Sequence, residues 1–196
     1  GYRVLVHPRL TLDLSAFYYD YDHLKSVSQS PIELRFNPAN QPYLYASVTT
    51  GNDLYGEAYG TELAATWQPR EGWRVRGSYS LLSLALHTRG TTPSVSEGDE
   101  GVDPKHQVKL WSDLDLGRHL EWGLGWRYVS GEPFIGISSY TELDTRLAWK
   151  PTPHCELAIV GRSLLASHHR EFAPYVLIDP NVEVDRSVFA KLTLKF

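Results

Sequence analysis

The chain has 196 residues, with 23 acidic and 19 basic side chains and a formal net charge of -4. This weakly acidic balance disfavours a nucleic-acid-binding protein, which normally carries a basic patch. The single Cys excludes an internal disulfide and a zinc site built on several cysteines. No apolar run approaches the ~20 residues of a transmembrane helix, and the mean hydropathy is -0.32. Hydropathy alone therefore indicates a soluble globular protein.

Apolar and polar residues alternate with a period of two along most of the chain, which is typical of β-strands with two different faces. The clearest examples are residues 10–19, 73–81, 120–128 and 188–196, whose apolar faces carry no charge. We predict nine strands and no helix. In chain order the strands span residues 2–7, 10–19, 55–68, 73–81, 106–116, 120–128, 140–149, 155–163 and 188–196.

Short and long connections alternate between the predicted strands. The short ones contain the turn-forming residues Pro or Gly and lie at 7–9, 69–72, 116–119 and 151–154. The long ones are polar loops at 22–54, 87–104, 130–139 and 164–186. Short turns at one edge and long loops at the other are the pattern of an outer-membrane β-barrel. The sequence thus predicts an all-β fold, an antiparallel up-and-down meander of about nine strands.

Strand length and aromatic placement favour a membrane barrel over a soluble β-sandwich. Most predicted strands approach the ~9–11 residues that cross a bilayer at a tilt. Aromatic residues gather beside the short turns and at the chain end, as in the aromatic girdle of membrane barrels. They are Trp67, Trp73, Trp122, Trp149 and Phe196. A soluble sandwich stays open as an alternative, because the period does not say which face points outward.

Three motifs near the C-terminus stand in a recognisable order. Residues 140–151 read as a late strand and its turn, residues 160–165 followed by 169–172 as a penultimate strand, and residues 183–196 as a final strand ending in Phe. Together they resemble the C-terminal barrel of TonB-dependent outer-membrane receptors. That family usually has Asn where this chain has Ser163, and often Pro where it has Arg170. Residues 59–69, 72–80 and several near the N-terminus extend the resemblance over nearly the whole chain.

The resemblance implies a 22-stranded transmembrane barrel with a plugged lumen, of which residues 1–196 form a partial β-barrel domain without the plug and the N-terminal strands. The intact receptor would take up a scarce solute, such as a ferric siderophore or cobalamin, bound at its extracellular loops. The TonB complex would act through the missing N-terminal region, and the barrel-assembly machinery through the C-terminal strand ending in Phe196. The implied location is the outer membrane of a Gram-negative bacterium, in contact with its lipid, with no nucleic-acid partner and no enzymatic activity.

Two polar clusters contain types of residue that bind metals. His168 and His169 stand close to Glu171, and an acidic stretch with Asp99, Glu100 and Asp103 precedes His106. Neither cluster has the spacing of a zinc motif, so we interpret both as solvated loops. We assign no catalytic, cofactor-binding or metal-binding residue and expect no cofactor. The ligand-contacting residues are left unknown.

The remaining alternatives belong to other functional classes. They are an outer-membrane barrel enzyme, a porin and a soluble carbohydrate-binding β-sandwich. A barrel hydrolase needs a nucleophile paired with a His; the candidate residues are Ser130, Ser138, Ser139, His87 and His106, and the sequence does not make them neighbours. We interpret Cys155, which begins an apolar face, as a packing or lipid-facing residue.

Overall fold

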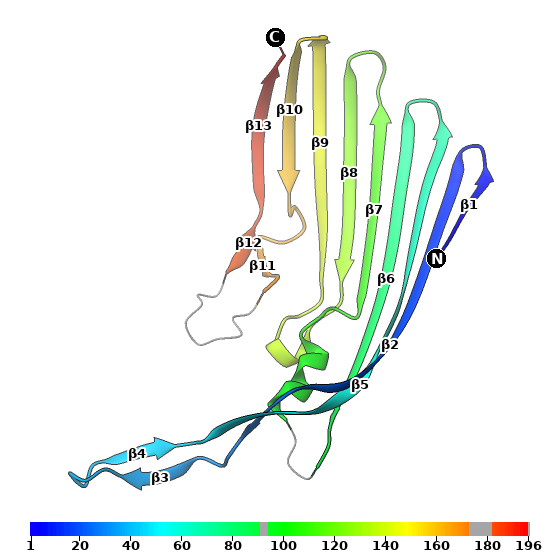
Figure 1. Ribbon diagram of the computed structural model, residues 1–196. Coiled ribbons are helices and arrows are strands. Elements are labelled where there is room, and N and C mark those ends of the chain that lie inside the picture. Colours follow the sequence, from blue (N-terminus) through cyan, green and yellow to red (C-terminus); the bar gives the residue numbers. More distant parts are fainter. Residues whose placement is uncertain (91–93, 173–181, 196) are drawn as a thin grey trace.

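A computed structural model describes residues 1–90, 94–172 and 182–195. Within these residues, nine strands form one antiparallel sheet in which the neighbours follow chain order (Figure 1). The strands are β1 (Tyr2–His7), β2 (Leu10–Gln29), β5 (Val48–Arg70), β6 (Trp73–Thr88), β7 (His106–Asp115), β8 (Leu120–Val129), β9 (Tyr140–Thr152), β10 (Cys155–Arg162) and β13 (Ser187–Leu194). The predicted antiparallel meander is confirmed. Because β1 and β13 are edge strands, the sheet is open and does not close into a barrel.

The short connections all lie at one end of the sheet, which we call the short-turn end, and β13 also finishes there (Figure 1). Gly72 and Gly117 occupy two of these turns with φ of 74° and 94°. This left-handed backbone region is easily accessible only to Gly, which explains these two residues in otherwise polar turns. Phe196, the predicted end of the last strand, lies outside the described residues.

The long polar connection predicted over residues 22–54 consists largely of strands. β2 and β5 continue through most of it, and a further hairpin of β3 (Glu33–Phe36) and β4 (Pro42–Tyr45) completes an arm that projects from the sheet (Figure 1). Antiparallel pairing needs only backbone hydrogen bonds, so it persists in a polar sequence. Ile32, Leu34 and Phe36 alternate there with charged residues, but this run is short and the rest of residues 22–54 is mainly polar, so the sequence signal for a strand is weak.

Other long connections also contain structure. Two 3-10 helices, η1 (Val95–Gly101) and η2 (Pro133–Ile135), correct the expectation of no helix, and β11 (His168–Arg170) pairs with β12 (Glu183–Asp185). The Ser94 side chain accepts a hydrogen bond from the backbone N–H of Ser96 and so caps η1. Of the helices in the described ranges, none has the length and apolar character to span a membrane.

Strand register sorts the side chains of the sheet onto two faces, because residues paired across antiparallel strands point the same way. One face has no Lys, Arg, Asp or Glu at its described strand positions over a broad band. The band runs from the short turns to the paired residues Tyr18 and Tyr59. We call this face the uncharged face. The uncharged band ends there, because the next pair on this face is Asp20 and Glu57. Large apolar residues on it are exposed: Leu14, Leu63, Trp67, Leu110, Trp122, Leu147, Trp149, Ile159 and Leu192.

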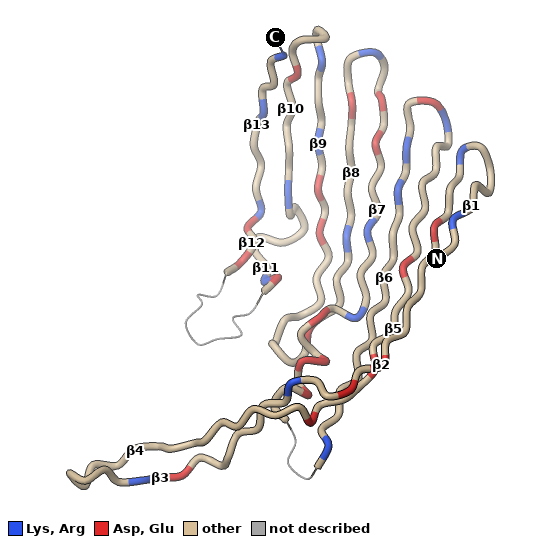
Figure 2. The backbone as a smooth tube through the Cα atoms, in the orientation of Figure 1, with Lys and Arg blue, Asp and Glu red and all other residues tan. Residues whose placement is uncertain are grey.

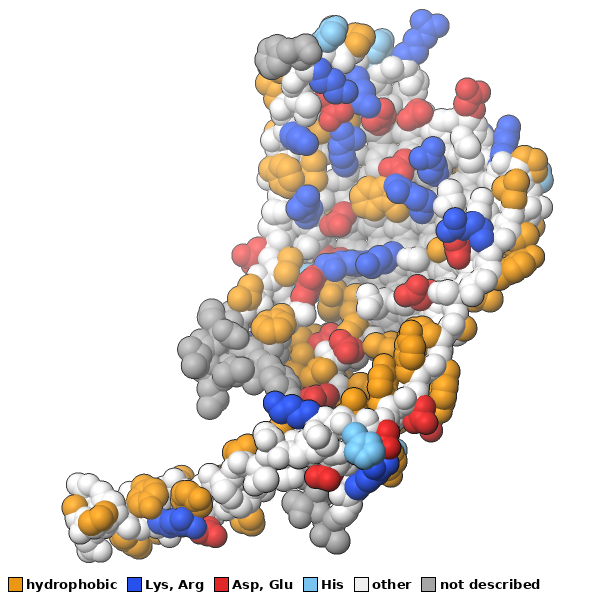
Figure 3. Space-filling view, in the orientation of Figure 1, with side chains coloured by type: hydrophobic (Ala, Val, Ile, Leu, Met, Phe, Trp, Pro, Cys, Tyr) orange, Lys and Arg blue, Asp and Glu red, His pale blue; other side chains and the backbone are white. Residues whose placement is uncertain are grey.

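The opposite face, which we call the charged face, holds the charged strand residues together with most of the small buried core. Figure 3 shows Lys, Arg, Asp and Glu side chains gathered on the side of the sheet turned to the viewer. The buried apolar residues of this face are Leu54, Ala58, Leu86, Val129, Ala148 and Ala158. The small buried core thus lies on the charged face, while the uncharged face presents large apolar side chains to its surroundings. A continuous exposed apolar surface normally contacts lipid or another protein.

Glycines on the charged face make room for aromatic rings. A Cβ added at Gly125 would lie 2.1 Å from the Trp111 ring, and one added at Gly60 would lie 2.5 Å from the Phe17 ring. Trp111 also donates a hydrogen bond from its indole N–H to Asp113 at 2.6 Å. Aromatic rings that cover strand glycines replace the packing that those residues lack. The glycines of β8 thus have a packing role on the face that the sequence predicted to be polar.

Candidate functional site

Charged residues near the short-turn end of the charged face are paired across strands. Arg146 on β9 contacts Glu156 on β10 at 2.5 Å, and Lys150 contacts Glu121 on β8. Arg76 on β6 contacts Asp113 on β7 at 2.6 Å. Opposite charges on facing strands stabilise the register, and this pairing keeps the face polar without a large net charge.

A hollow of about 520 Å³ lies on the charged face of β9, β10 and β13. Four cationic side chains line it, against two carboxylates. Arg162 lies over the Phe189 ring at 5.6 Å from its centroid, and Arg146 is neutralised by Glu156. The cationic residues are Arg127, Arg146, Arg162 and Lys191, and the carboxylates are Asp144 and Glu171. Because Arg146 pairs with Glu156 and Arg127 with Glu171, the remaining lining charges are two cationic and one anionic, and this small positive excess favours an anionic group in the hollow.

One side of this hollow adjoins a buried cluster around His169. Its Nδ1 lies 2.9 Å from Glu142 Oε1 on β9, and its Nε2 lies 2.8 Å from Glu171 Oε1. The side chains of His169 and Glu142 are only 9% and 1% exposed. Arg127 on β8 completes the cluster by an ion pair with Glu171, and the Tyr140 ring packs 4.6 Å from the imidazole. Three separate parts of the chain, namely β8, β9 and the segment around β11, therefore meet at one histidine.

Charge interactions set the pKa of Glu171 at this site. Burial alone would raise the pKa of its carboxyl, but hydrogen bonds from His169 and Arg127 and the charges of both residues outweigh burial and lower it. Glu171 is therefore held in its ionised form. The sequence singled out His169 and Glu171, but it gave no indication of Glu142 and Arg127 as partners, apart from their positions on the charged faces of their strands.

Ser163 positions the segment that leads into this cluster. Its φ is 52°, in the left-handed region, and its backbone N–H donates to Asp144 Oδ1 at 2.9 Å. Asn adopts this backbone region more readily than other non-glycine residues. Ser163 therefore holds a backbone conformation that Asn, the residue expected here from the sequence resemblance, adopts more readily.

The acidic stretch before His106 caps strand ends and does not converge on an ion. Glu97 accepts the backbone N–H of Thr88 at 2.7 Å, and Glu100 accepts that of Leu86. Burial, together with the negative charge of Asp103, raises the pKa of the Glu132 carboxyl. Figure 2 shows acidic residues on the connection that leads from β6 to β7, below the strands of the sheet. Across residues 1–90, 94–172 and 182–195, no three His, Cys, Asp or Glu side chains converge to hold a metal ion.

The serines and histidines of the hydrolase alternative do not form a nucleophile–base pair around His106. The His106 ring contacts the Tyr79 hydroxyl at 2.9 Å, whereas the Ser130 hydroxyl accepts the backbone N–H of His106. His87 packs against Tyr55, with ring centroids 5.5 Å apart. Ser138 and Ser139 lie between η2 and β9, on the connection that follows β8. His106 is therefore engaged elsewhere and is not oriented as the base for Ser130.

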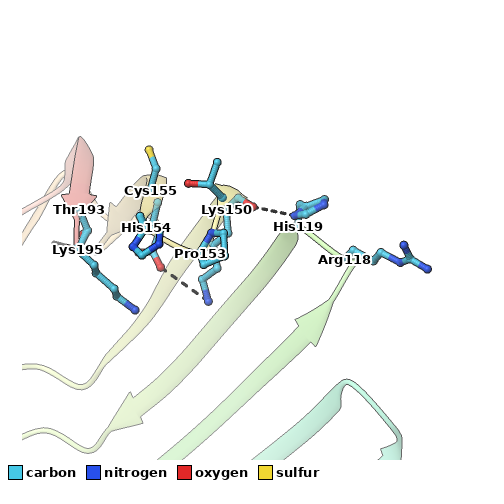
Figure 4. A pocket seen from close by; sticks show the side chains of 10 residues that line it. Arg118, His119, Lys150, Pro153, His154, Cys155, Thr193 and Lys195 are labelled. Atoms are coloured by element: carbon cyan, nitrogen blue, oxygen red, sulfur yellow. Dashed lines mark hydrogen bonds and ion pairs between the residues drawn. The ribbon is translucent and has the colours of Figure 1, made fainter.

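A second pocket, of about 260 Å³, lies at the short-turn end and is lined mainly by basic residues (Figure 4). The His119 ring contacts the backbone carbonyl of Lys150 at 2.9 Å. Cys155 lies at the start of β10, paired with Leu194 on the uncharged face as its sequence position predicted. The ionisable side chains in its lining include Arg118, His119, Lys150, His154, Glu156 and Lys195. The pocket holds three Arg or Lys side chains against one carboxylate, that of Glu156.

Comparisons with known proteins agree with this geometry. The family described as "TonB dependent receptor-like, beta-barrel" matches residues 1–162, and no curated protein matches the sequence. Solved structures share the fold at low identity. The ferric-catecholate import receptor Fiu from K12 E. coli superimposes with a TM-score of 0.63 and 16% identity, over 96% of this chain and 25% of that receptor.

Two other structures give the same result. The copper transporter OprC has a TM-score of 0.64 and 14% identity, over 97% of this chain and 30% of that one. The siderophore receptor PiuA from Acinetobacter baumannii has a TM-score of 0.65 and 16% identity, over 96% of this chain and 26% of that one. The chain thus spans between a quarter and a third of these transporters. With the meander of strands and the two faces of its sheet, the chain belongs to the TonB-dependent receptor-like β-barrel family.

Proposed function

We propose that this chain is part of an outer-membrane TonB-dependent receptor that takes up a scarce metal-containing solute. The observation that carries the proposal is the sheet itself, with large apolar residues exposed on one face and paired charges on the other. In a membrane barrel the first face contacts lipid and the second lines a wet lumen. The family match and the transporter structures support this assignment.

The similar proteins indicate a chemical class for the transported solute, but they do not identify the solute itself. Those proteins are named for a ferric catecholate, for copper and for a siderophore, and we propose a ferric siderophore or another metal chelate, with cobalamin as a further candidate. The cationic hollow beside β10 favours an anionic solute. The contacting residues would come from the long connections, which leave the sheet at the end opposite the short turns.

The proposed partners follow from the same assignment. Outer-membrane lipid would contact the uncharged face, the TonB complex would act through a segment outside these residues, and the assembly machinery would read the strand that ends in Phe196. Deleting Phe196 from the full-length protein is expected to reduce its surface level. Normal assembly after the deletion would count against a role for this residue.

The proposed function is tested by location and uptake together. Cells that express the full-length protein are fractionated, and its gel mobility is compared before and after heating, which changes the migration of folded membrane barrels. Uptake of radiolabelled iron chelates, copper and cobalamin is then measured with and without a functional TonB complex. We expect outer-membrane localisation and TonB-dependent uptake of one solute. A soluble protein would overturn the membrane assignment, whereas TonB-independent passage of many solutes would indicate a porin.

A further inference from the structure

His169 lies between two carboxylates from different parts of the chain, in an arrangement that constrains its charge. Glu142 stands on one side of the imidazole and Glu171 on the other, 2.9 and 2.8 Å from its two ring nitrogens. Because the ring nitrogens face different carboxylates, one metal ion cannot be held by the ring and both carboxylates. The arrangement is suited to a proton, since imidazolium carries an N–H on each nitrogen whereas neutral imidazole carries only one.

The ionised form of Glu142 depends most on a positive charge on His169. Its side chain is 1% exposed, and its contact with Nδ1 of His169 is short but not aligned as a hydrogen bond. The attraction at this contact is therefore mainly Coulombic and exists only while His169 is charged. A buried carboxylate without a compensating charge is strongly disfavoured. Neutral His169 could donate to Glu171 alone and would leave Glu142 uncompensated.

The other charged groups around His169 are already engaged. Arg127 on β8 pairs with Glu171 and lies 5.3 Å from the Tyr140 ring centroid, and Tyr140 on β9 packs on the imidazole. On the same strand, Asp144 accepts the Ser163 N–H.

The hairpin that carries His169 brings further charges, which are also paired. Arg170 pairs with Glu183, and Asp185 on β12 lies opposite His168. Within the described residues His169 is thus the cation placed against Glu142.

We propose that His169 is a pH-sensitive latch that holds the β11–β12 hairpin against the charged face of β8 and β9. When His169 is protonated, it links Glu142 to Glu171 and the hairpin stays docked. When His169 loses its proton as the pH rises, the attraction to Glu142 is lost and the hairpin detaches. The docked state is therefore favoured at low pH. This inference goes beyond the proposed function and does not depend on the cargo.

Hydrogen exchange of the full-length protein in detergent micelles tests the latch. The amides of β11 and β12, and that of Arg186, which bonds to the Ser167 carbonyl, are followed at about pH 5.5 and pH 8.5. Rates are corrected for the intrinsic pH dependence of chemical exchange. Loss of a charge-assisted contact should raise the opening frequency about tenfold or more at the higher pH. Equal corrected rates at both pH values would overturn the proposal.

Three variants separate the latch from general destabilisation. His169→Gln stays neutral, so the hairpin should exchange rapidly at both pH values. Glu142→Gln removes the buried charge, so neutral His169 suffices and exchange should be slow at both. His168→Gln is the matched control, because that ring contacts only the adjacent Ser167 hydroxyl among its described partners; it should keep the wild-type pH dependence. Retention of the pH step in both His169→Gln and Glu142→Gln, or its loss in His168→Gln, would contradict the latch.

Discussion

Neighbouring residues on single strands of this sheet have opposite environments. On β10, Ile159 is 58% exposed while Ala158 beside it is 3% exposed, and on β9 Trp149 is 50% exposed while Ala148 is fully buried. In a protein dissolved in water the large apolar residues would be the buried ones. The small residues of the buried core therefore lie on the charged face, and the uncharged face presents large side chains that suit an apolar surrounding. Under the proposed function that surrounding is lipid.

The largest expected effect comes from unpairing a buried charge on the charged face. His169→Leu leaves Glu142 without its compensating charge and should lower the free energy of unfolding by about 3–5 kcal/mol. The double variant His169→Leu/Glu142→Leu should recover most of the loss, because both charges are gone. Urea unfolding of the full-length protein in detergent measures both variants. A double variant as unstable as the single one would show that the cost arises from packing.

A charge placed on the uncharged face should cost almost as much. Leu192, 58% exposed on β13, would contact lipid under the proposed function, and Leu192→Arg should cost about 2–4 kcal/mol near the bilayer midplane. Lys191→Ala, one residue away on the charged face, should cost little. Folding into lipid vesicles, followed by urea titration, compares the two. Equal costs at both positions would mean that the faces are assigned the wrong way round.

A smaller effect is expected where an aromatic ring fills the space above a glycine. In Gly125→Ala the added methyl group would lie 2.1 Å from the Trp111 ring, and displacing that ring should cost about 1–3 kcal/mol. Gly117→Ala is a less suitable control because of its positive φ, so Ser78→Ala, also on the charged face, serves instead. Fluorescence of Trp111 should report the displaced ring. An unchanged spectrum and stability would remove the packing role assigned to Gly125.

The smallest effect is expected for an exposed ion pair on the charged face. Arg76 and Asp113 are 52% and 44% exposed and lie 2.6 Å apart. Exposed pairs contribute about 0–1 kcal/mol, so Asp113→Asn should lower stability only slightly and less at high salt. Denaturation at two salt concentrations measures the difference. A loss as large as that of His169→Leu would mean that the face is far less hydrated than its exposure indicates.

Local sequence patterns predicted the nine strands because each strand has its own alternation of apolar and polar residues. Residues 120–128, for example, alternate Leu and Trp with Gly, Glu and Arg, and the corresponding β8 spans Leu120–Val129. The arm between β2 and β5 escaped prediction because its apolar alternation is confined to the short run of residues 32–36, while the flanking strand pairing runs through polar sequence. The roles of Gly123 and Gly125 were equally hidden, since they depend on Trp111 in the neighbouring strand.

The sequence by itself thus determined the class of fold, the order of its strands and the two chemically different faces, because each depends on residues close together in the chain. Tertiary structure alone decided which face is exposed and which residues meet. His169 and Glu171 are neighbours in sequence, but Glu142 and Arg127 reach them only because β8 and β9 pair and the hairpin of β11 and β12 folds back onto them. Long-range contacts of this kind follow from strand pairing and curvature, and neither property is encoded in a single segment.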